Sequence, residues 1–154
     1  MNVTPYAAFG SVLYICSVDD ISYVDKHGAD STGDWRYIIK GSSSCKLDDG
    51  TTTYFPEKSV VINSKLDPNR VITVQPNTSW ICIPKAFSNF KNYPKVTELN
   101  VGDSFKIKKG ENVFLISGDA FYNTTNIKGP YQLRVRTADI LLTAVSNCLL
   151  LTLE

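Results

Sequence analysis

The sequence is poor in residues that hold metal ions. Its 154 residues include one histidine, His27, and its four cysteines, Cys16, Cys45, Cys82 and Cys148, form no Cys-x-x-Cys pair. Structural zinc sites take four such ligands, usually in closely spaced pairs. We therefore expect no metal site and no other cofactor.

The sequence also lacks the short motifs that announce common enzyme classes. It has no Walker-type phosphate loop, no G-x-S-x-G, no H-E-x-x-H and no Rossmann fingerprint. His27 lies between Asp25 and Asp30, either of which would be able to orient it as a general base, but no nucleophile is tied to it by local sequence. An exposed loop histidine is the better interpretation, and we expect a protein that is not an enzyme and has no catalytic residues.

Net charge and long apolar runs are missing as well. The 16 basic and 15 acidic residues give a formal charge of +1, so no large field draws the chain to nucleic acid, and we expect none as a partner. No apolar stretch is long enough to cross a bilayer, and residues 1–6 lack the basic and apolar regions of a signal peptide. We expect a cytoplasmic or virion protein without membrane insertion.

Without a secretory signal, the cysteines are expected to be reduced. Cys16, Cys82 and Cys148 each lie in an apolar, strand-like run, where a free cysteine packs as a small core residue. An even number of cysteines also permits two disulfides, in any of three pairings. We expect free, buried thiols.

What the sequence does contain is a series of short β-strands. Runs rich in Val, Ile, Tyr, Phe and Thr alternate with clusters of Gly, Pro, Asn, Asp and Ser, which is typical of strands joined by turns. We predict a single all-β domain over residues 1–154, an antiparallel two-sheet β-sandwich of jelly-roll or cupin-like topology, with at most one helical turn at 85–93. The predicted strands are 11–18, 35–40, 51–55, 59–63, 70–75, 79–84, 96–100, 104–108, 112–117, 131–137, 140–145 and 148–153.

Side-chain alternation indicates which strands are central. Two runs, Val113–Ile116 and Leu149–Leu151, are apolar on both faces, so each is either central in the sandwich or covered by another subunit. An oligomer is therefore expected. The sequences 47–50 and 108–112 each contain a glycine suited to a tight turn, and both are predicted to close β-hairpins.

Residues 96–107 read Val-Thr-Glu-Leu-Asn-Val-Gly-Asp-Ser-Phe-Lys-Ile, and Gly110 and the run Val113–Gly118 follow. This order resembles one half of a cupin-like double-stranded β-helix, where a Gly-Asp turn, a strand, a glycine turn and a strand ending in glycine succeed one another. The resemblance covers residues 96–145 and implies a jelly-roll shape. Cupin enzymes hold a metal with histidines and a carboxylate on these strands, but residues 112–118 contain no histidine, so that activity is not implied.

Two groups of residues are candidates for contact with a partner or ligand. In the segment 84–95, three aromatic residues interleave with lysines, which suits a protein contact, a core-filling connector or, less well at this net charge, single-stranded nucleic acid. Two arginines alternate with apolar residues on one strand and are expected to face outward. The candidate residues are Phe87, Phe90, Lys91, Tyr93, Arg134 and Arg136.

From these features we predict a non-enzymatic structural or attachment module that works in a homo-oligomer or larger assembly through protein partners. A virion accessory protein, decorating a capsid or associated with a tail, is the kind of protein we expect. One alternative is a binding module that holds a sugar or nucleotide between its sheets, with Trp35, Trp80 or residues 84–95 as a stacking wall. A metal-free cupin-like isomerase is the other.

Overall fold

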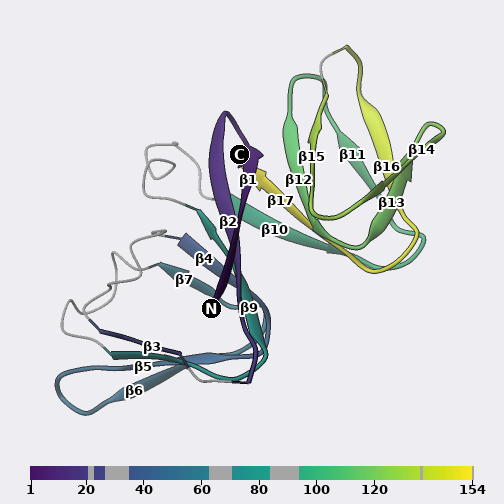
Figure 1. The fold of residues 1–154 in the computed structure, drawn as a ribbon. Coiled ribbons are helices and arrows are strands. Elements are labelled where there is room, and N and C mark those ends of the chain that lie inside the picture. The colour runs from purple at the N-terminus through teal and green to yellow at the C-terminus, as the bar shows by residue number, and fades with distance from the viewer. Residues whose placement is uncertain (21–22, 27–34, 63–70, 84–93, 136, 154) are drawn as a thin grey trace. The chain divides into compact units, whose positions relative to one another are not determined.

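A computed structural model describes residues 1–20, 23–26, 35–62, 71–83, 94–135 and 137–153, and all regular structure in these ranges is β-strand. The chain divides into two compact units, Met1–Asn89 and Phe90–Glu154 (Figure 1). The first unit contains β1 (Asn2–Ala8), β2 (Ser11–Val18), β3 (Tyr23–Lys26), β4 (Trp35–Lys40), β5 (Ser43–Lys46), β6 (Thr52–Phe55), β7 (Val60–Ile62), β8 (Val71–Val74) and β9 (Thr78–Ile83). The second contains β10 (Pro94–Leu99), β11 (Ser104–Ile107), β12 (Asn112–Ser117), β13 (Asp119–Tyr122), β14 (Thr125–Lys128), β15 (Tyr131–Arg134), β16 (Ile140–Ala144) and β17 (Cys148–Leu153).

Each unit is built from two antiparallel sheets. The sheets of the first unit have the orders β1-β2-β9-β4-β7 and β3-β8-β5-β6, and those of the second have the orders β10-β17-β12-β15 and β11-β16-β13-β14. Eight strands that pass in this way between two facing four-stranded sheets form a jelly roll. The predicted all-β jelly-roll class is therefore confirmed, with four sheets in the chain rather than two.

The two units repeat one topology. Adding eight to each strand number converts β2-β9-β4-β7 into β10-β17-β12-β15, and β3-β8-β5-β6 into β11-β16-β13-β14. Strand β1 is the one addition, paired along its whole length with β2 at the sheet edge. This division into units does not test the prediction of a single domain over residues 1–154, which stays a prediction.

Every strand expected from the sequence is present, with ends that differ by at most about three residues. Five strands were not predicted: β1, β3, β5, β13 and β14. Their sequences explain why, since β5 (Ser-Ser-Cys-Lys) and β14 (Thr-Asn-Ile-Lys) are short and polar, and β1 carries Pro5, which is tolerated only at an edge. The helical turn expected at 85–93 lies outside the described residues.

One predicted hairpin is confirmed and the other is wrong. Strands β5 and β6 pair through the turn at 47–50, where the Gly50 N–H donates to the Leu47 carbonyl over 3.0 Å. The turn at 108–112 also forms, with Gly110 at φ 87°. However, the strands on its two sides, β11 and β12, belong to different sheets, so it is a crossover and not a hairpin. A tight turn fixes the local chain reversal, and the pairing is decided by the rest of the fold.

The strands that are apolar on both faces are central in their sheet. Strands β17 and β12 are neighbours in the middle of β10-β17-β12-β15, as one of the two alternatives predicted. Phe114 and Leu151 are 1% and 0% exposed in the single chain. The expected oligomer stays a prediction.

Each unit has its own apolar cluster between its sheets. In the second unit the cluster draws on all eight strands, β10 to β17, and includes Ile107, Leu115, Leu142 and Leu150. In the first unit it is smaller and contains three of the four cysteines together with Trp80. All four cysteines are buried and free, which confirms the expectation for the thiols.

Candidate functional site

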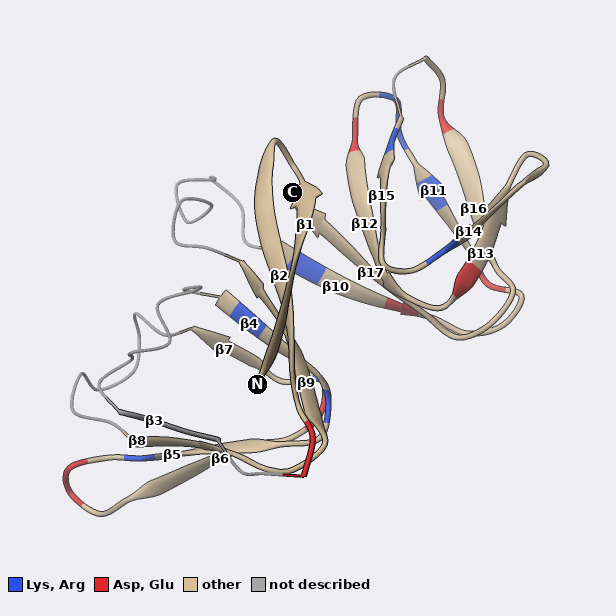
Figure 2. Cartoon of the chain, in the orientation of Figure 1, with Lys and Arg blue, Asp and Glu red and all other residues tan. Residues whose placement is uncertain are grey.

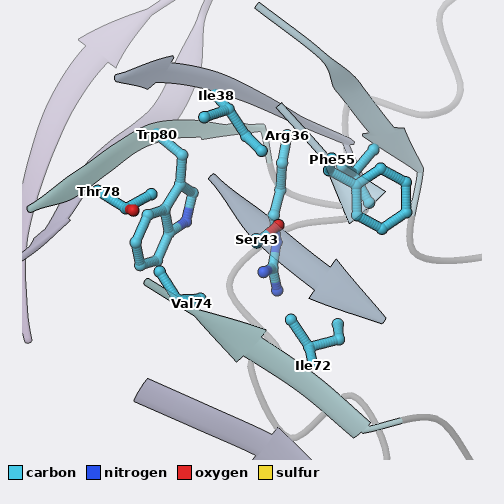
Figure 3. A pocket seen from close by; sticks show the side chains of 9 residues that line it. Arg36, Ile38, Ser43, Phe55, Ile72, Val74, Thr78 and Trp80 are labelled. Carbon is cyan, nitrogen blue, oxygen red and sulfur yellow. The ribbon is translucent and has the colours of Figure 1, made fainter. Parts of the chain in front are cut away.

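A small cavity lies between the two sheets of the first unit, and we call it the N-terminal cavity. One sheet contributes side chains from β4, β7 and β9, and the other from β5, β6 and β8 (Figure 3). The volume open to the centre of a water-sized sphere is about 20 Å³. This is room for one or two water molecules, or for a chemical group of a few heavy atoms. The lining residues are Arg36, Ile38, Ser43, Phe55, Val61, Ile72, Val74, Thr78 and Trp80.

Because side chains alternate between the two faces of β4, one charged side chain of this strand points into the interior between the sheets. Residues 35–38 are all buried, and Arg36 and Ile38 line the cavity. Side chains of Trp35 and Tyr37 leave the opposite face of the strand, where their rings stack with centroids 6.4 Å apart and an angle of 12° between the planes. Within the buried residues 35–38, Arg36 is the one charged side chain, and it faces inward.

Arg36 is the only charged side chain in the described part of the chain that is buried, with 6% of its surface exposed. Figure 2 shows a basic residue within β4, as it does within β10 and β11, but only the one in β4 is buried. Figure 3 shows the Arg36 side chain reaching from β4 toward Ile72 on the facing sheet. Among the residues that the structure describes, the cavity lining holds one arginine and no acidic side chain.

Trp80 supplies a hydrogen-bond donor to the same space. Its side chain is 2% exposed, and its indole Nε1 has no hydrogen-bond partner in the structure. Strand pairing places Trp80 opposite Ile38 on β4, and the indole nitrogen faces the side of the cavity where Arg36 lies (Figure 3). A buried N–H group without an acceptor costs about 1–3 kcal/mol, so this atom is suited to meet an acceptor from outside the protein.

Two residues with hydroxyl groups complete the polar part of the lining, and the hydroxyl of one of them already has hydrogen-bond partners within the protein. The Thr78 hydroxyl donates to the Ser42 carbonyl over 3.1 Å and accepts from the Ser42 N–H over 3.2 Å. Ser43 lies on β5, between β6 and β8 of the same sheet, and it pairs with Phe55 on β6 and Val74 on β8. These three side chains therefore line the cavity side by side. The rest of the wall is apolar.

Of the predicted residues that the structure describes, only Trp80 belongs to the cavity. Trp35 lies on the other face of β4, and Arg134 is exposed on β15 in the second unit. The candidates Phe87, Phe90, Lys91, Tyr93 and Arg136 lie outside the described residues, as does His27, so their roles stay predictions. The sequence analysis missed Arg36, although a lone arginine two residues from Ile38 in an apolar strand shares the face of that isoleucine.

The sequence matches no family model, and no curated protein matches it. Solved structures do match its fold. The protein YhaK from Escherichia coli has a TM-score of 0.56 and 13% identity, over 100% of this chain and 87% of that chain. HutD from Pseudomonas fluorescens has a TM-score of 0.50 and 13% identity, over 98% and 86%. A Cupin 2 conserved barrel domain protein from Leptotrichia buccalis has a TM-score of 0.43 and 12% identity, over 93% and 82%.

The strand order and the likenesses to YhaK and HutD define a cupin-like jelly-roll fold, as the resemblance over residues 96–145 implied. The metal that cupin enzymes hold does not fit the N-terminal cavity, because its lining offers no histidine, cysteine or carboxylate. Among the described residues, no three such side chains come together anywhere. None of the described residues forms a helix able to cross a membrane.

Proposed function

We propose that the protein is a small-molecule binding module whose ligand enters the N-terminal cavity. This is the alternative to the assembly function that the sequence analysis favoured, and the cupin-like fold suits it better. Ligand sites are concave and mostly apolar, with a few polar groups that fix the orientation of the ligand. The cavity is lined by five aliphatic or aromatic side chains together with an arginine, an indole N–H and two hydroxyl groups.

The single observation that carries this proposal is the Trp80 indole N–H, which is buried and lacks an acceptor. Because the indole N–H lies in the cavity lining, an acceptor atom of a ligand can reach it. A donor without an acceptor in a packed core would only lower the stability of the fold. The volume of about 20 Å³ restricts the part of the ligand that enters to a few heavy atoms. A sugar ring or a nucleotide base exceeds it.

Ligand-dependent thermal stabilisation of the whole protein tests the proposal. A set of small neutral, cationic and anionic organic compounds is screened by differential scanning fluorimetry. We expect at least one compound to raise the melting temperature in a concentration-dependent way, because a ligand that binds only the folded state stabilises it. The result that would overturn the proposal is the absence of any such compound in all three charge classes.

A cavity-filling variant shows whether the compound binds in the N-terminal cavity. Val74→Leu adds one methylene group to the wall and is expected to reduce the ligand-induced shift severalfold. Leu141→Ala changes an exposed side chain in the second unit and is expected to keep the full shift. An unchanged shift in Val74→Leu would place the ligand elsewhere and contradict the proposal.

The assembly function and the absence of enzymatic activity both stay predictions. Neither the fold nor the cavity argues for a role in a virion.

A further inference from the structure

We infer that the group entering the N-terminal cavity is an uncharged carbonyl group on a short aliphatic skeleton, and that its oxygen accepts a hydrogen bond from the Trp80 indole N–H. This inference rests on the proposed function and names its ligand class. It depends on one donor that is fixed in place, on the lining around that donor (Figure 3), and on a contrast with the second unit.

The Trp80 donor is held in position by the sheet around it. Strand β9 lies between β2 and β4, and Trp80 pairs with Cys16 on one side and with Ile38 on the other. The side chain is 2% exposed, so bulk water does not reach its N–H group, and the structure gives this group no acceptor. A ligand acceptor therefore meets a donor that needs little further ordering.

The second unit shows that the fold itself does not require this donor. In the first unit the pairing of β9 with β4 shifts register at residues 38–40, and in the second the pairing of β17 with β12 shifts at 115–117. Aligning the two shifts places Leu150 where the first unit has Trp80. Leu150 is 0% exposed within the apolar cluster of its unit. Because leucine fills this place, the indole N–H is an addition that serves a ligand.

The lining favours an uncharged ligand. An ion of either sign loses its hydration on entry and needs a partner charge to recover that free energy. Arg36 is the one charged side chain in the lining that the structure describes, and it already has interactions within the protein. An ionic ligand would have to compete with those interactions, whereas an uncharged acceptor needs only the Trp80 N–H.

The hydrogen-bonding groups favour a carbonyl oxygen over a hydroxyl group. A carbonyl oxygen only accepts, so it brings no donor that would need an acceptor of its own. The Thr78 hydroxyl already donates to Ser42 and accepts from it, which leaves Ser43 as the other hydroxyl of the described lining. The space of about 20 Å³ restricts the skeleton to two or three carbon atoms. Acetone is therefore the probe of choice.

The experiment follows the Trp80 indole N–H directly. In the ¹H–¹⁵N spectrum of the full chain, the indole signals of the two tryptophans are assigned with Trp35→Phe. Acetone, acetate and isobutene, which has the shape of acetone with a methylene group in place of the oxygen, are titrated separately at constant ionic strength. We expect acetone to move the Trp80 indole proton downfield and to saturate at about ten millimolar, as so few ligand atoms permit. Isobutene and acetate are expected to cause no downfield shift.

Two matched variants examine the anchoring donor. Trp80→Phe keeps an aromatic side chain but removes the N–H, and is expected to weaken acetone binding about fivefold to tenfold, followed by the methyl signals of Val74 in the lining. Trp35→Phe is the same substitution on the face of β4 that points away from the cavity, and is expected to keep the wild-type affinity. If Trp80→Phe does not fold, the contrast between acetone and isobutene in the wild type decides.

The outcomes separate this inference from the proposed function. A downfield shift of the Trp80 signal with acetate and none with acetone overturns the carbonyl assignment and leaves the binding function standing. An equal shift with isobutene, or equal acetone binding by wild type and Trp80→Phe, overturns the assignment in the same way. A failure of all three probes, together with a compound screen that finds no ligand, overturns both.

Discussion

Gly41 shows at the scale of one residue how closely the strands around the N-terminal cavity approach. Its φ of +87° lies in the left-handed region, and an added Cβ would lie 2.7 Å from the Cα of Thr78 and would also meet the Thr78 hydroxyl. The Thr78 side chain is itself fixed by Ser42. Only glycine therefore fits at position 41, for reasons of both conformation and space.

We predict that Gly41→Ala destabilises the protein more than Gly50→Ala. Gly50 has nearly the same φ, +86°, but an added Cβ there meets nothing within 4 Å, so only the conformational cost of roughly 1–2 kcal/mol applies. Gly41→Ala adds a steric cost of about 1–3 kcal/mol. Urea denaturation of both variants measures the difference, and equal free energies of unfolding would contradict the close approach.

The cysteines give a second prediction at this scale. Cys148 is 1% exposed and its thiol donates to the carbonyls of Asp119 and Ser146, each over 3.2 Å. Burial raises the pKa of the Cys148 thiol above its ordinary 9.0, and the nearby Asp119 carboxylate raises it further. We therefore expect the native protein to react slowly with Ellman's reagent at pH 8, and the urea-unfolded protein to react quickly at all four thiols.

The raised pKa of Cys148 also has a consequence for stability. Because the folded state favours the neutral thiol, the contribution to stability is fully present below the unfolded pKa and is lost as pH rises through the folded pKa. The loss with increasing pH, at values above 9.0, is expected to be smaller in Cys148→Ala, which removes the contribution of this thiol. A variant with the same alkaline profile as the wild type would contradict this assignment.

At the scale of an element, the β5–β6 hairpin illustrates how a turn is held by its own sequence. The Thr51 N–H donates to the Asp49 carboxylate over 2.8 Å, and this bond, with a further one from the Thr51 side chain, lowers the pKa of Asp49 below its ordinary 3.8. A carboxyl group whose pKa is lowered on folding stabilises the fold above its unfolded pKa. That stabilisation is lost as pH falls through the folded pKa.

We therefore predict that Asp49→Ala lowers the melting temperature at pH 7 and that the difference from wild type vanishes as the pH falls below 3.8. Asp48→Ala is the matched control, because it removes the neighbouring carboxylate and keeps the contact between Asp49 and Thr51. Thermal unfolding followed by circular dichroism at several pH values measures both. A difference that persists at the lowest pH would contradict the role of the ionised carboxylate.

The central strands of the second unit allow a sharper comparison. Leu150 on β17 is 0% exposed within the apolar cluster, whereas Leu141 on β16 is 57% exposed. Leu150→Ala is expected to cost about 2–5 kcal/mol, because it leaves a cavity, while the same change at Leu141 is expected to cost less than about 0.5 kcal/mol. Similar free energies of unfolding for the two variants would show that the cluster is not packed as described.

At the scale of the whole molecule, the expected oligomer can be tested directly. The chain has a mass of 17.1 kDa, and the assembly prediction requires a multiple of it at micromolar concentration. Size-exclusion chromatography with light scattering measures this mass. A value of 17.1 kDa would contradict the oligomer.

The whole-molecule topology is a duplication that the sequence does not display. Strands β2 to β9 and β10 to β17 follow the same path between two sheets, yet β5 reads Ser-Ser-Cys-Lys and its counterpart β13 reads Asp-Ala-Phe-Tyr. A jelly roll requires alternating apolar positions and turns at suitable places, and many residue choices meet that requirement. Sequence identity between the repeats is therefore not needed to keep the fold.

The sequence by itself determined the all-β class, most strands, the tight turns and the buried thiols, because these follow from side-chain alternation and from local backbone conformation. Only the tertiary structure decided that β11 and β12 separate into different sheets and that Arg36 meets Trp80 in one cavity. Those facts depend on contacts between strands far apart in the chain. A local pattern of residues carries no information on which distant strand becomes a neighbour.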